Sequence, residues 1–254
     1  MESTRPAIPE SPTPAGRLGM LLRGNLLFLL ALLIARPAAA AMNDWQFELN
    51  AATGRTTRGL NESGGQPVVG AAASWYPAGG LFAGISASSF KIPRSSQTGA
   101  EIIASGGYEW RIAGDWTIQA SLTHYQYEHV PFANRMNYDE AALRGGWRDS
   151  VFVSVTASPN TGFGPSPRSR AFSYDVAGRL PLVHGFSATG GIGYYDLRAE
   201  KDIRYVYGDV GLTYQYRSAQ FDLWYIFTNG SATADARLGP IIFNGLIADV
   251  VWQF

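Results

Sequence analysis

The chain of 254 residues has a formal net charge of zero and contains no cysteine, so disulfide bonds contribute nothing to its stability. Its 20 basic residues form no patch or stripe along the sequence, which excludes nucleic-acid binding as the main function. Without disulfide bonds, the stability of the fold must come from its closure, from hydrogen bonding or from contact with lipid.

The first recognisable element is a long apolar run, Leu26 to Ala35, near the N-terminus. It is too short to span a bilayer as a helix. Arg17 and Arg23 precede it, and an alanine-rich exit, residues 37–41, follows. This order predicts a secretory signal peptide over residues 1–41, cleaved before the mature domain 42–254. The Pro- and Ser-rich residues 1–19 are unusual before such a signal, so Met20 is an alternative start; a buried helix is the other interpretation.

After residue 41 the recurring pattern is a two-residue alternation of apolar and polar side chains, which is typical of strands. The runs are long enough for a tilted strand to cross the hydrocarbon layer. Twelve such runs follow one another, at residues 45–50, 69–75, 81–87, 102–110, 116–122, 141–147, 151–157, 172–180, 186–194, 206–216, 221–227 and 246–254.

The connections between these runs alternate between long and short, beginning with 53–65 (long), 77–80 (short), 91–99 (long) and 112–115 (short). Bacterial outer-membrane barrels combine short periplasmic turns, longer external loops and an even number of strands. The pattern predicts an all-β, closed antiparallel transmembrane β-barrel of about 12 strands. Both termini would then lie in the periplasm. A soluble β-sandwich is the alternative, although it has no reason to sort its turns by length.

Aromatic residues gather at the ends of the predicted strands. Tryptophans beside the short turns or termini predict an aromatic belt at the periplasmic face of the membrane: Trp45, Trp75, Trp110, Trp116, Trp147 and Trp252. A second belt is predicted at the opposite ends, from Tyr125, Tyr127, Tyr138, Tyr174, Tyr194, Tyr195, Tyr205 and Phe227. The final strand carries Val250, Trp252 and Phe254 in phase, which resembles the assembly signal of outer-membrane barrels.

Most ionisable residues fall on one parity of the strands, and a charge that faces hydrocarbon costs a few kcal/mol. The exceptions lie at strand ends on the outer rim and include His124, Asp139, Asp196 and Arg204. We therefore expect this parity to line the lumen: Glu48, Glu101, Glu109, Arg111, Glu140, Arg144, Asp175, Arg179, Asp209, Asp222 and Asp249. These groups either fill a narrow barrel with ion pairs or line an acidic, water-filled passage that favours cations. Residues 159–170 are a candidate for a constriction that folds inward, with an external loop as the alternative.

Catalytic chemistry has little support in the sequence. The one candidate combination of nucleophile and base is Ser121 or Ser154 with His124. His124, however, lies on the parity opposite to the one predicted to face the lumen. No G-x-S-x-G elbow, P-loop, EF-hand loop or H-E-x-x-H motif is present. We predict no catalytic residues, no metal and no cofactor.

Three stretches resemble the TorF-type family of proteobacterial outer-membrane porins. Arg58-Gly59-Leu60 with residues 66–70 is similar to the opening motif of that family, Gly80 to Ser88 to its following hairpin, and Tyr125-Gln126-Tyr127 with residues 137–140 to a later segment. The likeness extends over most of residues 45–254, although residues 128–131 reach Pro131 later than the family pattern does. The resemblance implies a pore-forming outer-membrane protein with no catalytic residues to transfer.

Together these patterns predict a porin-like outer-membrane channel for ions or small polar solutes. Its predicted partners are outer-membrane lipid, the barrel-assembly machinery and the transported solutes, with no nucleic acid. Two alternatives stay open at this stage, a lipid-modifying enzyme embedded in the barrel and a non-conducting structural or adhesive barrel.

Overall fold

The protein was analysed as a computed structural model that describes residues 44–92, 95–112, 114–162, 167–201, 203–229 and 242–254. The predicted signal peptide, residues 1–41, and the alternative start at Met20 lie outside the described residues and stay predictions.

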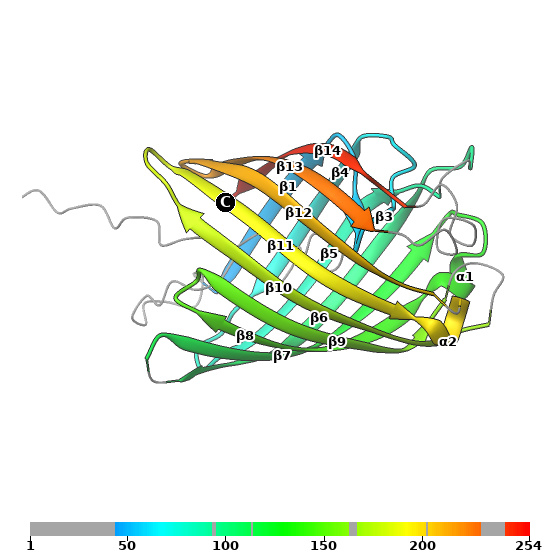
Figure 1. Cartoon of the computed structure of the whole chain (residues 1–254), viewed down its shortest axis with the longest axis horizontal. Helices are drawn as coiled ribbons and strands as arrows, with labels where there is room; N and C mark the ends of the chain where they lie inside the picture. Colours follow the sequence, from blue (N-terminus) through cyan, green and yellow to red (C-terminus); the bar gives the residue numbers. More distant parts are fainter. Residues whose placement is uncertain (1–43, 93–94, 113, 163–166, 202, 230–241) are drawn as a thin grey trace, which may run out of the picture.

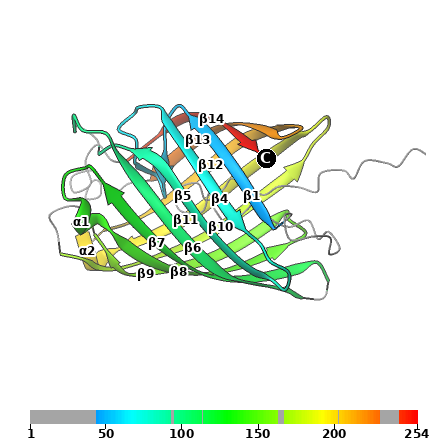
Figure 2. The same cartoon turned by 180° about the vertical axis from the view of Figure 1, so that it is seen from behind.

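Twelve strands form one closed antiparallel barrel, which confirms the predicted fold class. The strands run obliquely around a single-layer wall (Figure 1, and from behind in Figure 2). Neighbours in the wall are neighbours in the sequence, except where the first strand pairs with the last. The barrel strands are β1 (Trp45–Ala52), β4 (Val68–Trp75), β5 (Leu81–Phe90), β6 (Gly99–Ile112), β7 (Trp116–Glu128), β8 (Tyr138–Trp147), β9 (Val151–Thr161), β10 (Ser169–Pro181), β11 (Phe186–Leu197), β12 (Ile203–Tyr216), β13 (Ala219–Asn229) and β14 (Gly245–Gln253).

The wall closes where β1 pairs with β14. Glu48 lies opposite Gln253, and the register continues to Ala52 opposite Asp249. Phe47 and Phe254 exchange two backbone hydrogen bonds of 3.1 Å, and their rings stack. Every edge that an open sheet would expose is thereby paired, which is the condition for a β-structure in lipid.

The two ends of the barrel differ. One end, the turn end, carries the connections 76–80, 113–115, 148–150, 182–185 and 217–218, and Gln253 hydrogen-bonds to Ser218 there. The opposite end, the loop end, carries the other connections, including the single-turn helices α1 (Ala133–Met136) and α2 (Arg198–Lys201) (Figure 1). The difference in length between loops and turns is smallest at the loop-end connection 198–202, which is no longer than the turn 76–80. This connection is short because β11 and β12 extend beyond their predicted ends at the loop end.

The wall has an apolar outer face and a polar inner face. In β10, Tyr174 and Val176 are exposed on the outside, whereas the alternating residues Ser173, Asp175 and Ala177 are buried inside. Because side chains alternate between the faces of a strand, this distribution is the inverse of a soluble core. A β-sandwich is thus wrong for this chain.

Among the described residues, no helix is both long and apolar enough to cross a membrane.

Candidate functional site

The connection between β1 and β4, residues 53–67, folds into the barrel, and we call it the inward loop. It contains a small hairpin of β2 (Thr56–Thr57) and β3 (Leu60–Asn61). Arg58 and Gly59 form the two-residue turn, with φ angles of 49° and 75°. Positive φ at both central residues is the requirement of a type I′ hairpin turn, and glycine meets it without steric cost.

Contacts with strands all around the wall place this loop inside the lumen. Arg55 reaches β5 and β6, and Arg58 reaches β8 and β11. A methyl group on Gly59 would collide with Thr228 in β13 and come close to Tyr207 in β12. The backbone of Gly59 also accepts a 2.8 Å hydrogen bond from the amide of Phe243. A segment that touches strands from β5 round to β13 must cross the interior of the barrel.

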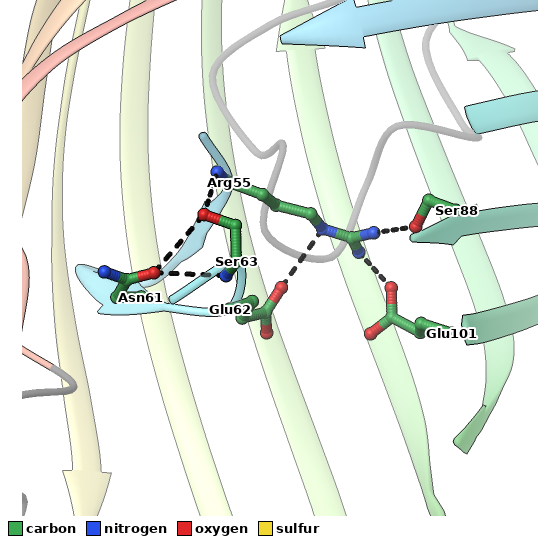
Figure 3. A network of polar contacts seen from close by, with 6 residues as sticks. All are labelled: Arg55, Asn61, Glu62, Ser63, Ser88 and Glu101. Carbon is green, nitrogen blue, oxygen red and sulfur yellow. Dashed lines mark hydrogen bonds and ion pairs between the residues drawn. The ribbon is translucent and has the colours of Figure 1, made fainter. Parts of the chain in front are cut away.

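Arg55 is the centre of a buried polar network (Figure 3). Its guanidinium donates to Ser88 and forms an ion pair with Glu101, and Nε lies 3.1 Å from a carboxylate oxygen of Glu62. The Arg55 amide donates to Ser63 Oγ at 3.1 Å, so the loop backbone fixes the position of the side chain. Because Arg55 and Glu101 are buried and Glu62 is only 13% exposed, the network holds the loop in one arrangement.

Arg58 extends the network to the opposite wall. Its Nη1 lies 2.7 Å from Oε1 of Glu140 in β8, and its guanidinium stacks 4.8 Å from the ring centre of Tyr195 in β11. The second oxygen of Glu140 accepts a 3.2 Å hydrogen bond from the hydroxyl of Tyr125. We call Arg55, Arg58, Glu62, Glu101 and Glu140 the constriction.

The carboxylates of the constriction stabilise its two arginines, whereas two of the acids oppose each other. Burial alone would lower the pKa of Arg55, but Glu101 and Glu62 outweigh burial and raise it above its usual range. The pKa of Arg58 is likewise raised, because Glu140 outweighs burial. For Glu62, burial and the nearby Glu101 raise the pKa to about 8, although Arg55 opposes them. The carboxyl of Glu62 therefore changes charge within reach of neutral pH.

Tyrosine rings fill the loop end around the constriction, which corrects the prediction of a second outer belt. Tyr125, Tyr127, Tyr138, Tyr195 and Tyr205 are buried inside the barrel, Tyr125 with no exposed surface. Two buried clusters hold these rings: one includes Leu60 of the inward loop with Tyr195 and Tyr205, and the other joins Phe90 and Ile103 to Tyr125, Tyr127 and Tyr138. Tyr138 and Glu140 share one parity, so the rule that places the acid inside also places the ring inside.

Of the predicted second belt, Tyr174 and Phe227 are exposed on the outer face. The ring of Tyr194 lies 6.4 Å from that of Tyr174.

The eleven residues predicted to line the lumen all lie on the inner parity of their strands. Glu101, Glu140, Arg144, Asp175, Asp222 and Asp249 are buried. Arg111 at the turn end is half exposed, with Nε 3.6 Å from Glu109. Glu48, Glu109, Arg179 and Asp209 are partly exposed. Two of the acids, Glu101 and Glu140, belong to the constriction.

The predicted belt and assembly residues lie on the outer face. Trp45, Trp75, Trp110, Trp116 and Trp252 are exposed, with Trp252 at 56%. Trp147 is partly exposed, and its ring lies 6.4 Å from that of Trp116. Val250 and Phe254 share the exposed face of β14 with Trp252.

The weighed catalytic combination does not assemble. Ser121 and Ser154 are buried inside the barrel, whereas His124 is exposed on the outside and hydrogen-bonds to Asp139 at 2.7 Å. The wall therefore separates each hydroxyl from the base. Within the described part of the chain, no group of three or more His, Cys, Asp or Glu side chains is arranged to hold a metal ion.

The inward loop was not predicted from the sequence, where residues 159–170 were the candidate for a constriction. Residues 159–161 and 169–170 belong to β9 and β10, and Arg168 donates to the Asn134 carbonyl in the neighbouring connection. Residues 163–166 of this segment lie outside the described residues. A signal for the inward loop was present, since the eight predicted lumen acids had only three arginines to balance them. Arg55 and Arg58 supply two of the missing cations.

Comparison with solved structures gives the same fold. The chain is similar to the KdgM porin, with a TM-score of 0.51 and 11% sequence identity over 82% of this chain and 98% of that one. It is also similar to the NanC porin, with a TM-score of 0.52 and 9% identity over 83% of this chain and 98% of that one. At such low identity the likeness establishes the barrel alone.

No curated protein matches the sequence. A family model matches residues 39–243, which include the constriction and nearly the whole barrel. The chain belongs to this family, described as bacterial protein of unknown function (Gcw_chp).

Proposed function

We propose that the protein is a porin-like channel in the bacterial outer membrane that passes ions or small polar solutes. The observation that carries the proposal is the inverted wall, with apolar side chains outside and ionisable side chains inside a closed barrel. A barrel filled only for stability would do better with apolar residues, because unpaired buried charges are costly. The similar solved structures are porins by name, which supports the same assignment.

In this proposal the turn end faces the periplasm and the loop end faces outward. The N-terminal segment 1–41 is removed on export, and the tryptophan belt lies at the periplasmic interface. The outward-facing Val250, Trp252 and Phe254 are offered to the barrel-assembly machinery. We also propose that the protein is a porin of the TorF type.

The proposed passage is narrow and acidic. Asp209 in β12 is its strongest candidate for attracting cations, because its buried Oδ2 has no hydrogen-bond partner among the described residues. Its neighbours across the sheet are Gly191 and Ile226, which offer no side-chain donor. Asp175, by contrast, accepts hydrogen bonds from Ser173 and Tyr207.

Single-channel recording of the refolded protein in planar bilayers tests the proposal. We expect discrete conductance steps and a preference for cations that Asp209→Asn reduces more than Asp175→Asn does. A folded barrel that never conducts would overturn the channel assignment.

The packed tyrosines and the constriction favour one other candidate, a closed barrel that works through its loop end. In single-channel recording the wild-type channel should conduct, whereas a closed barrel should not. A variant in which residues 55–63 are replaced by a short Gly/Ser linker should conduct in both cases. The wild-type protein would conduct only if the passage beside the constriction is open.

A further inference from the structure

Arg144 in β8 is a buried cation with an unmet requirement for a partner. The residue is 9% exposed and points into the barrel. Its buried Nε has no hydrogen-bond partner, and the residue forms no ion pair, among the described residues. Its guanidinium lies over the face of Phe152 in β9, with 4.2 Å from Cζ to the ring centre. A buried guanidinium with five donors and no acceptor is costly, so it calls for an anion or for water.

The two carboxylates in the same row of the sheet as Arg144 are engaged elsewhere. In the sheet register, Arg144 lies opposite Gln119 in β7 and Ser154 in β9. The row continues from Gln119 to Glu109 in β6 and from Ser154 to Asp175 in β10. Glu109 contacts Arg111, and Asp175 accepts from Ser173 and Tyr207. Neither acid closes onto Arg144.

The direct neighbours of Arg144 instead carry hydrogen-bond donors and no charge. Residues directly opposite in adjacent strands have their Cβ atoms about 5 Å apart. The Gln119 amide, the Arg144 guanidinium and the Ser154 hydroxyl therefore form a row on the inner wall. No side-chain hydrogen bond occupies Gln119 or Ser154 among the described residues. A central guanidinium flanked by an amide and a hydroxyl matches the acceptors of an oxyanion.

Further arginines add positive charge towards the turn end. Asp149, in the turn 148–150, has a pKa raised by burial, and Arg111, Arg144 and Arg179 act together to lower it. All three guanidiniums therefore act on one region at the turn end. They come from β6, β8 and β10, alternate strands of the same side of the wall.

We infer that Arg144, with Gln119 and Ser154, forms an oxyanion-binding site on the lumen wall, for the carboxylate or phosphate group of a small solute. The inference rests on the proposed function, because such a solute reaches the site through the lumen. Arg144 supplies the charge and two parallel donors, and its flanking residues supply one donor each. The site acts locally on the anionic group of a solute, in a lumen whose remaining charge is acidic.

Calorimetric titration of the refolded barrel in detergent, with acetate and separately with inorganic phosphate at constant ionic strength, tests the inference. The two probes distinguish a carboxylate site from a phosphate site. We expect one of them to bind and Arg144→Gln to weaken its binding about tenfold or more. Arg144→Lys should retain part of the affinity, since it keeps the charge but loses the two-pronged geometry.

Arg148→Gln is the matched control. Arg148 lies at the same end of β8 but is exposed and paired with Asp115, so its loss should leave binding unchanged. Heat-modifiable migration on gels establishes that each variant is folded. If neither probe binds the wild-type protein, or if Arg144→Gln binds as tightly as wild type, the inference is wrong.

Conductance of the same preparations separates this inference from the proposed function. A barrel that conducts but binds no oxyanion would overturn the site and leave the channel standing. A barrel that binds the oxyanion through Arg144 but never conducts would overturn the channel and leave the binding site standing.

Discussion

Arg58, at the tip of a hairpin that leaves β1, forms an ion pair with Glu140 in β8, with 2.7 Å between Nη1 and Oε1. β8 lies on the far side of the closed strand order from β1. This contact therefore bridges the lumen and fixes the inward loop against the opposite wall.

Loss of one partner of this pair should be costly. Arg58→Met leaves Glu140 as an uncompensated buried charge, and we expect it to destabilise the barrel by about 3–5 kcal/mol. Arg58→Met with Glu140→Gln should recover much of that loss and should raise conductance. Urea unfolding of the barrel in lipid vesicles measures the free energies. Arg148→Met, at an exposed pair, should cost about 0–1 kcal/mol; an equal cost at both sites would contradict the bridging role.

Gly59→Ala should displace the inward loop. The residue has φ of 75°, and the added methyl group would meet Thr228. The backbone strain alone is about 1–2 kcal/mol. Gly65→Ala is the control, since Gly65 has φ of 76° but nothing near its missing side chain. Hydrogen exchange of the loop amides should increase more in Gly59→Ala, and equal exchange in the two variants would mean that close packing at Gly59 is unimportant.

The loop should loosen at alkaline pH. The pKa of Glu62 is about 8 with the loop in place, above the ordinary value of 4.5, so the protonated carboxyl favours the docked loop. That contribution is complete below about pH 4.5 and is lost as the pH rises through about 8. Conductance recorded between about pH 6 and pH 9 should therefore rise with pH. Glu62→Gln should abolish this dependence, and a variant that keeps the full dependence would assign it to another group.

His124→Ala should leave membrane lipids unaltered. His124 and Asp139 form an exposed pair on the outer face, and the wall separates both from Ser121. We expect a stability change within about 1 kcal/mol. Mass-spectrometric profiles of phospholipid and lipid A, from cells with the wild-type or the variant protein, check this. A changed profile would revive the enzyme alternative.

Tryptophan fluorescence should report the two faces of the wall. A variant that keeps only Trp116, which is exposed, should be quenched by brominated lipids. A variant that keeps only Trp224, which is buried inside, should be protected. Equal quenching of the two variants would contradict the assignment of the outer face to lipid.

The fold was predictable because the parity of side chains is a local property. The alternation of Tyr174 and Val176 with Ser173 and Asp175 is visible in the sequence, and lipid and lumen impose the same two-residue period on every strand. The twelve runs therefore correspond to the twelve barrel strands.

The constriction was not predictable in the same way. The contact of Arg58 with Glu140 joins positions 82 residues apart, through a loop without a periodic pattern. The buried tyrosines were wrongly assigned because aromatic character was given more weight than parity. Tyr125 follows the same alternation as Ser121 and Thr123, which are buried on the inner face.

The pairing of β1 with β14 also determines how the protein must be made. Glu48 and Gln253 are 205 positions apart, so the seam between them forms only after nearly all of the domain has been synthesised. Until then the growing sheet has two open edges whose amides and carbonyls lipid cannot satisfy. Insertion and seam formation must therefore be coupled, and a chain truncated before β14 would remain an aggregation-prone open sheet.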